Sequence, residues 1–190
     1  MVEATAVLEF WFGAPTSSDY GKSRTFWFTK SNETDARIRE QFGAAVEAAL
    51  SGALTEWEAT PRSTLALIVL LDQFTRNIFR DTPRAFAGDE RALALARGLV
   101  ESGGHLQLAP IERWFVYMPF EHSEALDDQR TALRLFRGLE SDGITDLAMW
   151  AQKHHDVVAR FGRFPHRNAI LGRSSTAEEV AFLKEPGSRF

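Results

Sequence analysis

The stretch LALIVLLDQFTRNIFR, residues 65–80, decides the fold of this chain. Its uniformly apolar part, residues 65–71, is far shorter than the roughly 20 residues that a membrane span needs. Asp72, Arg76 and Arg80 then recur at every fourth position, so a continuous helix carries all three on one face. We therefore expect a very apolar helix with one acid and two guanidinium groups embedded in it.

Helical spacing continues on both sides of this stretch. Ile38, Phe42, Val46 and Leu50 recur every four residues, as on one face of an α-helix. Five prolines stand where helices are expected to begin: Pro61, Pro83, Pro110, Pro119 and Pro165. Proline is tolerated at the start of a helix because the N–H that it lacks would have no partner within the helix. Three glycines stand where helical patterns stop: Gly52, Gly138 and Gly162. A capping box is expected at Ser175–Glu178, ahead of the last helix.

No alternating strand pattern and no Pro- or Ser-rich linker interrupts these helical segments. We expect residues 1–190 to form a single all-α domain of about eight to ten helices joined by short loops. The composition agrees, because 44% apolar and 25% charged residues are typical of a globular chain. It excludes a disordered chain, and the absence of cysteine excludes a disulfide scaffold and thiolate chemistry.

The charge and the N-terminus point to a cytoplasmic protein without nucleic-acid or membrane partners. A net charge of -4 and a pI near 5.8 argue against binding that depends on neutralising phosphates. The first residues lack the basic region and apolar run of a signal peptide. We also expect no metal and no cofactor, because no phosphate-binding loop or metal-ligand spacing is found and the adjacent His154 and His155 point apart on a helix. His154 lies on an apolar stripe and is expected to be a hydrogen-bonded core residue.

Basic residues gather in one segment near the C-terminus. Residues 157–177 contain no acid but carry Arg160, Arg163, His166, Arg167 and Arg173. Several of them flank an expected helix start at Pro165, where the helix dipole prefers an anion. The balancing charge is therefore either a bound anion or the protein's own carboxylates.

A third polar group of residues follows Pro119. Glu121, His122, Ser123 and Glu124 place two carboxylates, an imidazole and a hydroxyl within one turn. Buried charges are tolerated only when they are paired. We therefore expect this cluster, the helix around Asp72 and the basic C-terminal segment to meet.

These segments also carry a family resemblance. The motifs are VLEFWFG (7–13), LDQF (71–74) with RNIFR (76–80), MPFEHSE (118–124), and FGRFPHRN (161–168) with LGR (171–173). In this order they resemble the signatures of an uncharacterised, mainly bacterial family, catalogued as domain of unknown function nine-two-four. The resemblance implies a tetratricopeptide-like fold and no established reaction. Thr75 stands where proline is common in that family, and threonine disturbs a helix less.

Three functional hypotheses remain open. The first is a binding module whose cationic pocket takes an anionic small molecule or an acidic peptide, lined by Arg76, Arg80, Arg163, His166, Arg167, Asn168 and Arg173. The second is a hydrolase- or lyase-like enzyme in which His122 or His166 acts as acid or base, oriented by Glu121, Glu124 or Asp72. The third is a purely structural clasp of arginines and carboxylates, with function exerted through a protein partner.

Overall fold

The computed structural model describes residues 2–188, and every regular element in that range is helical, with no strand. This confirms the predicted all-α class. The α-helices are α1 (Ala4–Phe12), α2 (Asn32–Ser51), α3 (Pro61–Ile68), α4 (Thr75–Ile78), α5 (Asp89–Glu101), α6 (Pro110–His122), α7 (Leu126–Glu140), α8 (Leu147–Phe161) and α9 (Ala177–Phe182). Between them lie the 3-10 turns η1 (Thr25–Trp27), η2 (Thr55–Ala59), η4 (Pro83–Phe86), η5 (Gly104–Gln107) and η6 (Pro165–Arg167), and the π-helical segment η3 (Val69–Phe74), which joins α3 to α4.

Most helix ends agree with the sequence-based expectation. Four prolines stand at the first position of a helix or 3-10 turn: Pro61, Pro83, Pro110 and Pro165. The Thr60 hydroxyl caps α3 by accepting the N–H of Ser63, a contact worth about 1 kcal/mol. Gly52 and Gly162 end α2 and α8 with left-handed backbones, which glycine adopts without strain.

Three expected helix ends are wrong. Pro119 does not begin a helix but lies inside α6, near its C-terminal end. Its ring nitrogen cannot donate to the carbonyl of Phe115, four residues earlier, so α6 lacks one backbone hydrogen bond. Gly138 lies within α7 instead of ending it. The capping box is formed by Thr176 and Glu179, one residue later than expected.

Most of residues 65–80 belong to the central helix of the molecule, which α3, η3 and α4 form without a break. Every residue from 64 to 75 is buried, through α3, η3 and the start of α4. The π-helical turns of η3 hold more residues than α-helical turns do, which changes the direction in which the following side chains point. Such insertions are frequent at functional sites.

Gly88 allows α5 to approach this central helix. A Cβ at this position would collide with the backbone carbonyl of Leu71. Because the obstacle is backbone, no side-chain rotation relieves it. Glycine therefore sets how closely the N-terminus of α5 lies against η3.

A cluster of aromatic rings fills the core between α1, η1, the central helix and α6. The indole of Trp11 is fully buried. Its ring centroid lies between 5.3 and 6.1 Å from those of Phe26, Trp27, Phe74 and Phe115. Each such pair adds about 0.5–1.5 kcal/mol beyond the area that it buries. The cluster fixes the position of α6 relative to the central helix.

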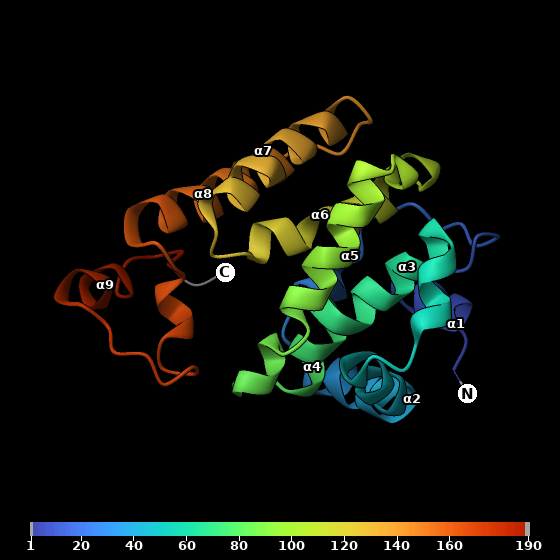
Figure 1. Cartoon of the computed structure of the whole chain (residues 1–190), viewed down its shortest axis with the longest axis horizontal. Helices are drawn as coiled ribbons and strands as arrows, with labels where there is room; N and C mark the ends of the chain where they lie inside the picture. Colours follow the sequence, from blue (N-terminus) through green and yellow to red (C-terminus); the bar gives the residue numbers. More distant parts are fainter. Residues whose placement is uncertain (1, 189–190) are drawn as a thin grey trace.

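Helices α6, α7 and α8 form one side of the molecule, and α7 lies along α8 (Figure 1). The C-terminal segment, residues 162–188, follows α8 and contains η6 and α9. It has its own small apolar contact, in which Phe164 is buried with Val157 and Val158. Within residues 2–188, every helix is too short or too polar to cross a bilayer. The tetratricopeptide-like arrangement stays a prediction.

Candidate functional site

Asp72 is the centre of the candidate site. It lies in η3 and is fully buried. Its carboxylate lies 2.7 Å from Nδ1 of His122 and 3.3 Å from Nη1 of Arg76, and the amide of Gln73 also donates to it. Burial alone raises a carboxyl pKa, but the charges and hydrogen bonds of these partners outweigh it and hold the pKa of Asp72 below its usual range. Asp72 is therefore a buried, ionised carboxylate.

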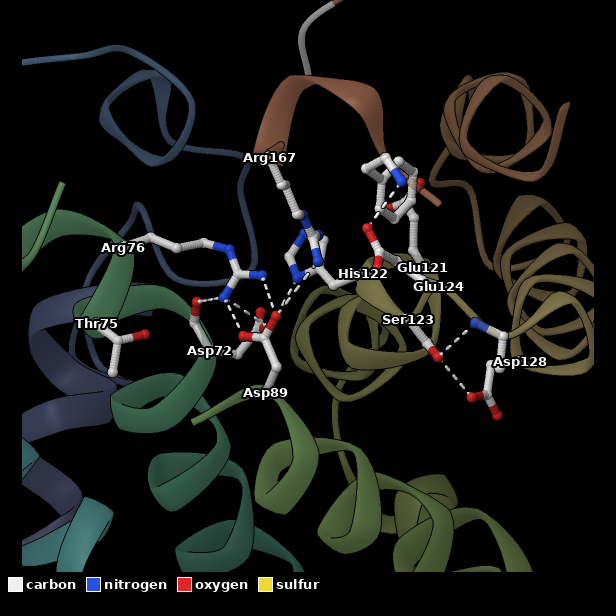
Figure 2. Close-up of polar contacts among 12 residues, drawn as sticks. Asp72, Thr75, Arg76, Asp89, Glu121, His122, Ser123, Glu124, Asp128 and Arg167 are labelled. Carbon is white, nitrogen blue, oxygen red and sulfur yellow. Dashed lines mark hydrogen bonds and ion pairs between the residues drawn. The ribbon is translucent and has the colours of Figure 1, made fainter. Parts of the chain in front are cut away.

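Arg76 connects this carboxylate to a second one. Its guanidinium donates to both oxygens of Asp89, at 2.7 and 3.0 Å, and to the backbone oxygen of Asp72 (Figure 2). Asp89 is the first residue of α5, where the helix dipole stabilises negative charge. The close approach that Gly88 allows brings Asp89 to Arg76.

Arg167 reaches the same carboxylate from the C-terminal segment. It extends from η6 toward Asp89, and one of its nitrogens lies 3.6 Å from an Asp89 oxygen (Figure 2). Its guanidinium is buried between the rings of Phe86 and Phe164, 4.9 and 4.6 Å from their centroids. Burial, together with the nearby charge of Arg76, lowers the pKa of Arg167 to about 10, so it remains charged near neutral pH.

His122, the last residue of α6, is the residue of this network that can accept a proton. Burial lowers the pKa of His122 and outweighs the opposing pull of Asp72. The imidazole is therefore neutral at pH 7, and its Nδ1–H donates to the Asp72 carboxylate. That hydrogen bond fixes the tautomer, so Nε2 is the ring nitrogen that can accept a proton.

Glu121 precedes His122 and is in the opposite protonation state to Asp72. Its side chain is only 5% exposed. Burial, with the charge of Asp72, raises the pKa of Glu121 to about 8. Glu121 is therefore mostly a neutral carboxylic acid at pH 7, able to donate a hydrogen bond.

His154 of α8 lies against Glu121. Its Nδ1 is 2.9 Å from the backbone oxygen of Trp150 and 3.2 Å from Glu121 Oε1. Burial lowers the pKa of His154 to about 3, so this imidazole is neutral as well. The expectation of a hydrogen-bonded core histidine agrees with these contacts.

Glu121, His122 and His154 line one cavity of about 500 Å3. Its walls are mainly apolar and come from α6, α7, α8 and the residue after η1: Phe28, Trp114, Met118, Phe136, Leu147 and Trp150. Its other polar lining residues are Thr145 and Asp146, which precede α8. A largely apolar cavity with a few polar groups is typical of a small-molecule site.

Aromatic rings are partly exposed around this cavity. Phe28 is 57% exposed and Trp150 47% exposed. The rings of Phe28 and Trp114 stack, with centroids 5.2 Å apart and an interplanar angle of 28°. Asp146, beside them, has a left-handed backbone with φ of 70°, which is uncommon for a residue other than glycine. Strained backbone of this kind is concentrated at functional sites.

The predicted clusters meet only in part. Asp72, Arg76, His122 and Arg167 come together around Asp89, with Glu121 beside them. His166 lies near them but does not line the cavity. Burial and then Arg167 lower its pKa to about 4.

Arg80 does not share the helix face of Asp72 and Arg76, which corrects that expectation. Helix α4 ends at Ile78, so Arg80 leaves the helical register. Its guanidinium instead donates to both oxygens of Asp35 in α2, at 2.8 Å each.

The protein's own carboxylates balance the basic C-terminal segment. Arg173 forms a two-bond contact with Glu124, at 2.7 and 2.9 Å, and also bonds to the side chain of Asn168. Each of the other three arginines also lies beside an acid: Arg160 beside Glu178, Arg163 beside Glu179, and Arg167 beside Asp89. Of the two open explanations, the carboxylates account for the four arginine charges.

Sequence reasoning missed Asp89 and most of the cavity lining. Nothing near Asp89 signals its role, because its partners Arg76 and Arg167 are remote in sequence. The lining of α6 does have a signal: Trp114, Met118 and His122 recur at every fourth position. The expectation that a helix begins at Pro119 concealed this register. Among residues 2–188, no three His, Asp or Glu side chains converge as a metal-ligand set, and we assign no metal site.

Comparisons with known proteins bear on the fold and the family of this chain. A solved structure of a protein of unknown function from Agrobacterium tumefaciens is similar, with a TM-score of 0.83 and 35% identity over 95% of this chain and 96% of that chain. A comparison with proteins of curated function finds no match. Residues 7–187 match the family described as bacterial protein of unknown function, DUF924. The chain therefore belongs to this bacterial family.

Proposed function

We propose that the chain is a hydrolase-like acid–base enzyme, with His122 as the general base. The observation that carries the proposal is the contact of 2.7 Å between His122 Nδ1 and the buried carboxylate of Asp72, made by a histidine that lines a cavity of about 500 Å3. In this arrangement Asp72 orients the imidazole and stabilises the imidazolium that forms on proton transfer.

The reaction that this site suits is attack of water on a carbonyl group. Nε2 of His122 takes a proton from water as the new C–O bond forms, and the imidazolium then returns that proton to the leaving oxygen. Glu121, as a neutral acid lining the same cavity, donates a hydrogen bond to the developing oxyanion. One group thus accepts a proton while its neighbour donates a hydrogen bond.

The other two hypotheses have less support from the contacts. Anion binding needs guanidinium donors that face a cavity, and those of Arg76, Arg80, Arg163 and Arg173 already bind carboxylates of the chain. A purely structural clasp accounts for Arg173 and Glu124. It gives no reason for a cavity-lining histidine that contacts a buried aspartate.

The test is ester hydrolysis by the wild type and two matched variants. We expect p-nitrophenyl acetate and p-nitrophenyl butyrate to be hydrolysed, and His122→Gln and Asp72→Asn to lower kcat by about 10²–10⁴-fold. His155→Gln is the control, because His155 also lies near an aspartate, 3.2 Å from Asp156, but does not line the cavity. Its kcat should equal that of the wild type.

Proton–nitrogen correlation NMR of the imidazoles tests the same proposal without a substrate. We expect His122 at pH 7 to carry its proton on Nδ1, and this signature to change in Asp72→Asn. An imidazolium at pH 7, or ester hydrolysis unaffected by either variant, would contradict the proposal. Urea unfolding of each variant separates lost chemistry from lost structure.

A further inference from the structure

The walls of the cavity restrict the charge of its ligand. No lysine or arginine is among its lining residues in the described part of the chain. An anion placed inside would meet Glu121 and Asp146 without a cationic partner. Burying an unpaired charge is costly, so anionic ligands are disfavoured.

A cation is disfavoured for a different reason. To pair with it in the buried part of the cavity, Glu121 would have to ionise close to Asp72, which is already a buried carboxylate. The second carboxylate of the lining, Asp146, is exposed, so water and salt screen its attraction for a cation. One face of Trp150 is also occupied, because Nζ of Lys153 lies 4.0 Å from the centroid of its ring.

The remaining lining groups suit a flat, uncharged molecule that accepts a hydrogen bond. Trp114, Phe28 and Trp150 offer ring surfaces against which an aromatic group can pack. Glu121 and His122 are both lining residues. A carbonyl oxygen can accept the hydrogen bond of Glu121, and the carbonyl carbon is open to attack by the water that His122 deprotonates.

We infer that the cavity binds an uncharged aromatic compound that carries a carbonyl group, with the ring against Trp114 and Trp150 and the carbonyl oxygen at Glu121. The inference names the substrate class of the proposed acid–base site and rests on that function. Glu121 is thereby assigned a binding role through a donated hydrogen bond, whereas His122 is the base.

Three probes of nearly equal shape test the charge preference: 4-fluoroacetophenone, 4-fluorobenzoate and 4-fluorobenzylamine. Fluorine NMR titration of the wild type at pH 7 measures the dissociation constant of each. We expect the uncharged ketone to bind about tenfold or more tightly than either ion. Tighter binding of the acid or of the amine, or no saturable binding of the ketone, would overturn the inference.

One variant and its matched control test the contact between the ring of the ligand and Trp150. Trp150→Ala should weaken binding of the ketone about three- to tenfold. Met149→Ala is the matched control, because Met149 is 50% exposed and adjacent but does not line the cavity. Equal effects of both variants would contradict the placement of the ring.

Glu121→Gln keeps a hydrogen-bond donor but cannot ionise. Binding of the ketone to the wild type should weaken about tenfold between pH 7 and pH 9, since the pKa of Glu121 is about 8. Binding to Glu121→Gln should be the same at both pH values. The charged and titratable groups around Glu121 are Asp72, His122, His154 and Asp146, with Arg76 and Arg167 beyond Asp72. A fall of equal size in the variant would assign the effect to one of them and refute the role of Glu121.

The binding assay separates this inference from the proposed function, because 4-fluoroacetophenone cannot be hydrolysed. Binding of the ketone without any hydrolysis of esters would refute the acid–base enzyme and keep the ligand class. Hydrolysis that depends on His122 without binding of the ketone would keep the enzyme and refute the ligand class.

Discussion

Glu121 and His122 show how burial, together with Asp72, prepares one residue to donate and the next to accept. Burial disfavours the charged form of each, which raises the pKa of the acid and lowers that of the imidazole. Both are therefore neutral at pH 7. The Glu121 carboxyl keeps its proton, while the Nδ1–H contact with Asp72 leaves His122 with an accepting Nε2.

Glu121 also makes stability depend on pH, and Glu121→Gln should remove that dependence. The pKa of Glu121 rises from 4.5 to about 8 on folding, so the folded state binds more protons between these values. The free energy of unfolding of the wild type therefore falls, relative to that of the variant, as pH rises from 4.5 to 8. Urea unfolding of both proteins at a series of pH values measures the difference, and parallel curves would refute it.

Contacts between side chains of the site could be predicted where both residues lie on one helix. They could not be predicted where the contact depends on the residue at which that helix ends. The spacing of Asp72 and Arg76 predicts their contact, since four residues separate neighbours on a helix face. The same rule fails for Arg80, because the helix stops before it. A helix end depends on tertiary packing, so periodicity alone did not locate it.

At the scale of elements, the N-terminus of α5 docks against the central helix at Gly88. Gly88→Ala should destabilise the protein by about 1–3 kcal/mol or more, because the added Cβ collides with the backbone carbonyl of Leu71. The matched control is Gly98→Ala within the same helix, where a Cβ meets nothing within 4 Å. That change should stabilise by about 0.5–1 kcal/mol. Thermal unfolding of the two variants measures both, and equal shifts would contradict this account.

The helix α6 explains why the lining of the cavity was missed in the sequence. Its apolar and polar lining residues have helical spacing, but Pro119 interrupts the pattern at the position where a new helix is usually expected. The aromatic core around Trp11 packs against Phe115 of α6 and helps to hold this helix in place. Tertiary packing thus keeps α6 continuous through Pro119, although proline is usually found at the start of a helix.

For the whole molecule, the buried groups predict a maximum of stability near pH 6.5. The pKa of His154 falls to about 3 and that of His166 to about 4, so the unfolded state binds more protons as pH falls below 6.5. Stability is lost in that direction, while Glu121 causes a loss as pH rises toward 8. These two histidines, joined by His122, whose pKa burial also lowers, outweigh one glutamate between pH 4.5 and 6.5. Thermal unfolding across this range measures the maximum, and stability that still rises from pH 6.5 to 8 would contradict it.

The π-helical segment η3 bears on how this chain tolerates a change in its length. A π-turn holds one residue more than an α-turn does, so the loss of one residue between 69 and 74 can be absorbed as ordinary α-helix. Six π-helical residues and five α-helical residues sweep nearly the same angle around the axis, so the side chains on the two sides of the deletion would keep their directions. Arg76 would still point toward Asp89. The same loss within the α-helical residues of α3 would rotate everything that follows by about 100°. The π-helical segment is thus a place where this helix can shorten by one residue without losing the phase of its side chains.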